Sequence, residues 1–144
     1  MKKQITLSLI LLVVILSRIT AQDKLYPNTF SLKDVELLDG PFKYACNLNV
    51  QNLLKYDTDR LLAPFLKEAG LTPKGEVFPN WVRLSGHVGG HYLSALAIHY
   101  AATGNPDCKK RMEYMLSELK RCQKANGNGY IGGVPDSKHL WEEA

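Results

Sequence analysis

The side chains best suited to chemistry in this sequence are histidines on one uncharged stretch. Residues 84–105, LSGHVGGHYLSALAIHYAATGN, contain no Asp, Glu, Lys or Arg, and they carry His87, His91 and His99. His87 and His91 are four residues apart, which is the spacing of a zinc-protease helix. Val88 stands where such a helix has its general-base Glu, so a protease of that type is excluded. The pair could bind a metal, line a polar ligand pocket or serve as hydrogen-bonded structural histidines.

A helix without a charged face must be buried on nearly all sides, so this stretch predicts an inner helix of a larger core. The cluster of Gly86, Gly89 and Gly90 predicts a start near Gly89, and the helix continues to Ala102. His99 is rotated about 80° from His91 around such a helix, so it need not share the same surroundings.

The next segment predicts an amphipathic helix, with Asn105 as N-cap and Pro106 at the first helical position. Its expected apolar face holds Cys108, Met112, Met115, Leu116, Leu119 and Cys122, and charged residues including Glu118 cover the rest. An uncharged helix joined by a short loop to an amphipathic one predicts an αα-hairpin between a core and water.

The segments before this hairpin predict further helices and loops. Residues 29–38 alternate in a way that predicts one or two short extended pieces, and Pro41 begins a helix to about Tyr56. Pro64 predicts a broken or short helix that ends at Gly70, and residues 72–80 have loop composition.

Two other patterns have ordinary structural interpretations. Gly127, Gly129 and Gly132 match G-x-G-x-x-G, but a helix precedes them and a loop follows, so we reject a dinucleotide site. A glycine C-cap and a turn explain them, although Tyr130 and Asp136 beyond could reach a ligand. Carboxylates such as Asp57, Asp59 and Glu68 lie near element ends, where capping is the default interpretation.

The N-terminus predicts export. Lys2 and Lys3 precede an apolar run too short to span a bilayer, so we expect residues 1–21 to be a cleaved signal peptide and residues 22–28 a flexible mature terminus. The protein would be secreted or periplasmic, without a membrane span in its mature form. Cleavage leaves 15 of the 18 basic residues against 14 acidic ones, a net charge near +1. This charge does not indicate binding to nucleic acid or to an anionic membrane.

The chain has three cysteines, Cys46, Cys108 and Cys122, and an odd number leaves one unpaired. Cys108 and Cys122 on one helix would be about 21 Å apart, too far for a disulfide. Small buried hydrophobic side chains are the simplest interpretation of all three.

The motifs LLDGPF, YDTDRLLAPFLKEAGL, GHVGGHYLSALA and ELKRCQKANGNGYIGG occur in this order. Together they resemble the N-terminal part of the glycoside hydrolase group of family 127 and family 146 β-L-arabinofuranosidases. The resemblance covers residues 29–144 and implies an all-α fold, the N-terminal part of an (α/α)6 barrel preceded by a short extended segment. The chain stops without a terminating signal, so we expect a truncated catalytic domain. Its expected partner is the remainder of the same domain.

The resemblance also implies retaining, exo-acting hydrolysis of plant glycans that contain arabinose. It implies a cysteine nucleophile at a zinc site of cysteines and a glutamate, with a second glutamate as acid/base. None of these positions matches this chain, so we expect the catalytic residues after Ala144, no zinc in this fragment and no activity of the fragment alone. The residues expected to bind the carbohydrate are His87, His91, Tyr130 and Trp81. Another (α/α)6 glycosidase, a polysaccharide lyase and a non-catalytic glycan-binding helical module are the alternatives.

Overall fold

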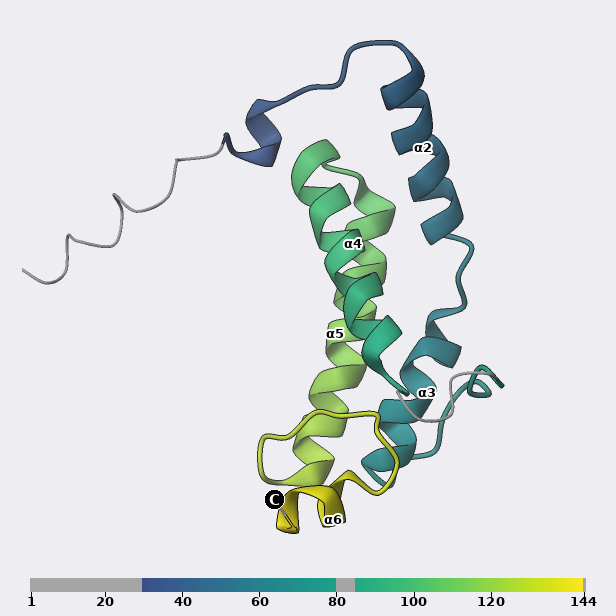
Figure 1. Ribbon diagram of the computed structural model, residues 1–144, viewed down its shortest axis with the longest axis vertical. Coiled ribbons are helices and arrows are strands. Elements are labelled where there is room, and N and C mark those ends of the chain that lie inside the picture. Colours follow the sequence, from purple (N-terminus) through teal and green to yellow (C-terminus); the bar gives the residue numbers. More distant parts are fainter. Residues whose placement is uncertain (1–29, 80–84, 144) are drawn as a thin grey trace, which may run out of the picture. The chain divides into compact units, whose positions relative to one another are not determined.

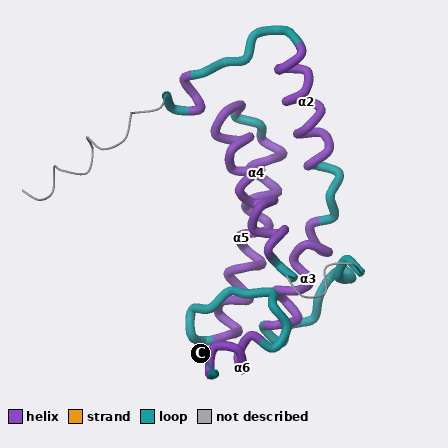
Figure 2. The backbone as a smooth tube through the Cα atoms, in the orientation of Figure 1, coloured by secondary structure: helices purple, strands orange, loops and turns teal. Residues whose placement is uncertain are grey.

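The computed structural model describes residues 30–79 and 85–143, and within them every regular element is a helix. These elements are a 3-10 turn η1 and five α-helices, and the described ranges contain no strand. Figures 1 and 2 show how the helices follow one another along the chain. Their bounds are η1 Leu32–Asp34, α2 Pro41–Leu53, α3 Thr58–Glu68, α4 His87–Thr103, α5 Pro106–Asn126 and α6 Ser137–Glu142. The all-α fold class predicted from the sequence is confirmed.

Contacts divide the chain into Met1–Ser31 and Leu32–Ala144, and η1 and the five α-helices all belong to the second unit. The expected signal peptide at residues 1–21, the terminus at 22–28 and Trp81 lie outside the described residues. None of the described helices is both long and apolar enough to cross a membrane.

Helices α4 and α5 form the predicted αα-hairpin and lie side by side along their lengths (Figure 1). Gly104 ends α4 in the left-handed conformation, with φ of 68°. The Asn105 side chain then accepts hydrogen bonds from the backbone N–H groups of Asp107 at 2.9 Å and Cys108 at 3.1 Å. These contacts confirm the predicted N-cap, because they satisfy N–H groups that have no partner within the helix.

The core lies where α3 and α4 pack against α5. The largest fully buried side chains are Leu62, Leu66, Leu96, Met115, Cys108 and Cys122. Leu116 was predicted on the buried face of α5 but is 49% exposed. It follows Met115 by one residue, about 100° around the helix, and so lies beside the contact rather than in it.

Helix α3 is continuous through Pro64, so of the predicted broken or short helix the structure has the short one, which ends at Glu68, two residues before Gly70. Asp57 caps its first turn, and Pro64 itself is buried along with Leu61, Leu62 and Leu66. A proline inside a helix costs one backbone hydrogen bond and about 3 kcal/mol. Burial of the apolar side of the helix offsets that cost.

The segment before α2 also differs from the prediction. Leu32–Asp34 forms the 3-10 turn η1 rather than an extended piece, and no strand partner is present in the described residues. Helix α2 begins at Pro41 as predicted but ends at Leu53, before Tyr56. It has no fully buried residue, and its Phe42 is 79% exposed.

Helix α4 is buried on one side rather than on nearly all sides. Its buried residues are Gly89, Tyr92, Leu96 and His99. The opposite side exposes His87, Gly90, His91, Ser94 and Ile98, which we call the open face of α4. The helix begins two residues before the predicted Gly89. The lack of charge therefore marks a helix that the described elements cover on one side only.

Polar contacts join the helices around this core. Tyr92 donates a hydrogen bond from its hydroxyl to the Leu53 carbonyl at 2.7 Å, which ties α4 to the end of α2. Glu118 was expected in the charged covering of α5, but its side chain is buried. It accepts from Lys74 at 3.0 Å and Arg121 at 2.6 Å, so its charge is paired, as a buried carboxylate requires.

The one-sided burial of α4 predicts that two truncations on that helix change the free energy of unfolding by very different amounts. Leu96→Ala should lower the free energy of unfolding by about 2 to 5 kcal/mol, because it leaves a cavity in the core. Ile98→Ala, at a side chain that is 55% exposed, should change it by less than about 0.5 kcal/mol. Urea unfolding followed by circular dichroism measures both, and equal losses would contradict the assignment of the open face.

Candidate functional site

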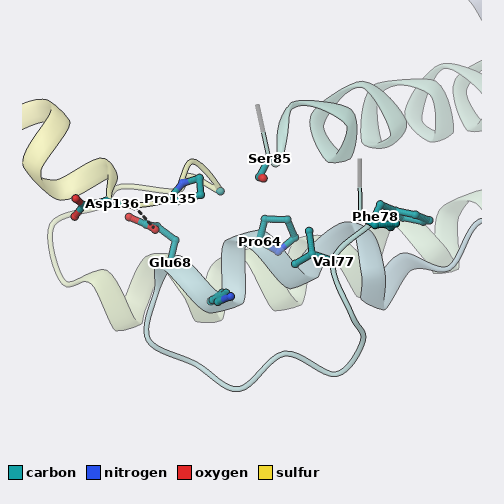
Figure 3. A pocket seen from close by; sticks show the side chains of 10 residues that line it. Pro64, Glu68, Val77, Phe78, Ser85, Pro135 and Asp136 are labelled. Atoms are coloured by element: carbon teal, nitrogen blue, oxygen red, sulfur yellow. Dashed lines mark hydrogen bonds between the residues drawn. The ribbon is translucent and has the colours of Figure 1, made fainter. Parts of the chain in front are cut away.

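A cavity of about 470 Å³ lies where α3, the start of α4 and the loop at residues 127–136 meet (Figure 3). Its apolar wall includes Pro64, Phe78 and Pro135, and its polar groups include Lys67 and Asp136. The full lining is Pro64, Lys67, Glu68, Val77, Phe78, Pro79, Ser85, Gly133, Pro135 and Asp136. An apolar hollow of this size with a few polar groups is typical of a small-ligand site.

Glu68, near the end of α3, holds the loop that closes this cavity. Its carboxylate accepts hydrogen bonds from the backbone N–H of Asp136 at 3.1 Å, from the backbone N–H of Ser137 at 2.8 Å and from the Ser137 hydroxyl at 2.6 Å. Ser137 is buried and begins α6. The sequence predicted Glu68 as a capping residue, and the helix that it caps is α6, which starts 69 positions later in the chain.

Two glycines bring the same loop against the helices. A Cβ added to Gly133 would lie 3.0 Å from the Pro64 Cβ and 3.1 Å from the Gly86 Cα. Gly86 itself has φ of 96°, in the left-handed region that glycine adopts without strain. The loop therefore contacts the start of α4 backbone to backbone, which fixes the Asp136 end of the cavity.

Tyr130 lines a second, smaller cavity of about 240 Å³, together with Asn126, Asn128 and Ser137. Its ring packs edge to face against Trp141 of α6, with centroids 6.4 Å apart. Glu68 lines both cavities and forms part of the wall that they share. The Tyr130 hydroxyl lies over Gly132, where a Cβ would overlap it.

The predicted histidines lie elsewhere. His87 and His91 project from the open face of α4, with ring centroids 6.0 Å apart in an edge-to-face arrangement. Neither lines the two cavities at Glu68, so the structure does not bring them together with Tyr130. His99 is on the buried side of α4, and its Nε2 is 3.3 Å from the Asn49 amide nitrogen. It therefore fits the structural interpretation.

Sequence reasoning missed most of the larger cavity. Lys67, Phe78 and Ser85 were not singled out, because their convergence depends on how α3 meets the loop at 127–136. Helix α6 was also missed and interpreted as loop. The available signal was Pro135-Asp136-Ser137, since Asp and Ser favour helix starts.

The polar groups of the larger cavity suit ligand binding better than bond cleavage. Glu68 has both oxygens occupied by the backbone and hydroxyl of the loop. Asp136 faces His139, whose Nδ1 is 3.1 Å from its carboxylate. The cavity therefore lacks the two uncommitted carboxyl groups that glycoside hydrolysis ordinarily uses.

The cysteines of the described chain do not fit a zinc site. No group of three or more His, Cys, Asp or Glu side chains in residues 30–79 and 85–143 is arranged to hold a metal ion. All three cysteines are unpaired, and Cys108 and Cys122 are fully buried. Desolvation by burial raises the pKa of both thiols, which disfavours the thiolate that a metal ligand or nucleophile must be.

The described residues are all-helical and contain an αα-hairpin whose first helix is uncharged. This is the kind of architecture from which α/α barrels are built. A family model described as β-L-arabinofuranosidase, GH127 catalytic domain, matches residues 34–144. The chain belongs to this glycoside hydrolase family, and its helical architecture agrees with part of an α/α barrel. A search of curated proteins gave no match.

The Glu68 contacts predict that this side chain orders the loop and α6. Glu68→Ala removes the acceptor of the exposed Asp136 N–H and of the buried Ser137 N–H and hydroxyl, and leaving the buried Ser137 donors unpaired costs about 1 to 3 kcal/mol each. Hydrogen exchange should rise at residues 134–142 and change little in α4. Glu113→Ala, at a surface ion pair of 3.8 Å with Lys109, is the control and should leave exchange unchanged.

Burial also predicts the order in which the thiols react. Cys46 is partly exposed, so it should react with a thiol reagent in the folded 144-residue chain. Cys108 and Cys122 should react only as the chain unfolds. Counting released chromophore before and after adding urea measures this, and Cys46→Ala should remove the fast reaction. Three fast thiols would contradict the packing of α5.

Proposed function

We propose that the chain belongs to an exported β-L-arabinofuranosidase and contributes binding surface for glycans that contain arabinose. The observation that carries this proposal is the family match over residues 34–144. It is supported by the open face of α4, which presents His87 and His91 on a helix without any charged residue. Neutral imidazoles donate and accept hydrogen bonds, as sugar hydroxyls do.

In this proposal the described residues bind and orient the glycan, and they do not break its bond. His91 and His87 hydrogen-bond one sugar from α4, and Tyr130, which lies apart from them, contributes an aromatic wall for another part of the glycan at the loop after α5. Trp81, expected to stack on a sugar ring, belongs to the same hypothesis. The zinc ligands and the nucleophilic thiolate expected for this family would have to come from other residues, because the described cysteines do not fit either role.

Export is proposed from the sequence of residues 1–21 alone. The basic start, the apolar run and the small residue Ala21 are typical of a cleaved signal. N-terminal sequencing of protein recovered outside the cytoplasm would identify the first mature residue. A mature protein that keeps Met1 would contradict this part of the proposal.

The function is tested by His91→Ala in the full-length protein, with an aryl β-L-arabinofuranoside as substrate. Loss of one hydrogen bond to the sugar should lower kcat/KM about tenfold, and circular dichroism should show an unchanged fold, because His91 is exposed. Lys120→Ala, on the exposed side of α5, is the control and should keep the wild-type kcat/KM.

Two outcomes would contradict the proposal. Full-length protein that binds arabinan but releases no arabinose, with or without zinc, would indicate a non-catalytic glycan-binding module. An active enzyme whose His91→Ala variant keeps its kcat/KM would instead remove His91 from the binding surface.

A further inference from the structure

A third hollow, of about 550 Å³, lies between the end of α2, the start of α3 and Phe78, and it shares only Phe78 with the larger cavity at Glu68. It is lined by Asn52, Lys55, Tyr56, Asp57, Arg60 and Phe78. None of these residues lies on the open face of α4. The hollow combines two cations, an amide, two aromatic rings and a single acid.

Arg60 is held so that part of its guanidinium remains available. Its Nε donates to the Glu76 carbonyl at 3.0 Å, and its Cζ lies 4.0 Å from the centroid of the Phe78 ring. No carboxylate pairs with it among the described residues. Stacking on a ring and one fixed N–H restrain the fork, while the Nη groups keep their donors for a planar anion.

The neighbouring side chains add charge and an apolar face. The Lys55 ammonium makes one long contact of 3.4 Å with the side-chain amide oxygen of Asn52, so it keeps donors for a ligand. Asp57 is the only acid in the lining, and its Oδ1 already accepts from the Asp59 and Arg60 backbone N–H groups as the cap of α3. The Tyr56 side chain is 47% exposed and offers a ring for stacking.

We propose that this hollow is a second glycan-binding site, selective for a sugar that carries a carboxylate. Arg60 pairs with the carboxylate through its Nη groups, Lys55 adds a second positive charge, and the apolar face of the sugar packs on Tyr56. A volume of 550 Å³ falls in the range of about 300 to 1,000 Å³ that ligand sites occupy. The site would hold an acidic glycan without taking part in hydrolysis.

The test is titration of the full-length protein with tri-galacturonate, followed by calorimetry at low ionic strength. Wild-type protein should bind it saturably, and the neutral methyl ester should bind at least about tenfold more weakly, since the charge-assisted contact is lost. Arg60→Gln should weaken binding about tenfold and Lys55→Gln less, because an exposed lysine contributes less. Lys120→Gln, the matched exposed cation on α5, should bind as wild type does.

Lys55→Gln decides the matter if Arg60→Gln fails to fold, because Lys55 is exposed and makes no core contact. Equal affinity for the uronate and its methyl ester would overturn the proposal, as would Lys55→Gln and Lys120→Gln variants that bind alike. Arabinose release by the same protein is measured separately. Loss of uronate binding with intact hydrolysis, or the reverse, therefore distinguishes this site from the proposed active-site surface.

Discussion

The packing of uncharged α4 against α5 and α3 is the interaction on which the other contacts depend. Leu96 fills the core between these helices and is fully buried. The polar atoms on the same side of α4 then need partners, and α2 supplies them through Asn49 and the Leu53 carbonyl. Helix α2 has no fully buried residue of its own, so these contacts give it a defined place beside α4.

A second constraint orders the loop that carries the cavity residues. Residues 127–136 form no helix or strand, and besides local hydrogen bonds they are held by Glu68 and by the contact of Gly133 with Gly86. The Glu68 contact is electrostatic and the contact of Gly133 with Gly86 is steric, so the two hold the loop independently of each other. The cavity consequently has one helical wall and one loop wall that is held by the Glu68 carboxylate and by the Gly133 contact.

The sequence predicted what local chemistry decides and failed where tertiary contacts decide. The cap at Asn105, the αα-hairpin and the shared face of His87 and His91 all follow from local spacing. The continuity of α3 through Pro64 depends on burial against Gly133, which no local rule contains. The cavity residues Lys67 and Ser85 were missed for the same reason. Which side of α4 the described elements cover was not predicted, because absence of charge does not say which side is covered.

The distribution of satisfied polar groups indicates which residues remain available for function. His99, Glu68 and Glu118 all have partners within the fold, and removing those partners would leave buried polar atoms unpaired. Their chemistry is thus committed to stability. His91 on the open face and the Arg60 fork are restrained without being saturated. Pre-ordered donors of this kind lower the entropic cost of binding a polyhydroxylated or anionic ligand.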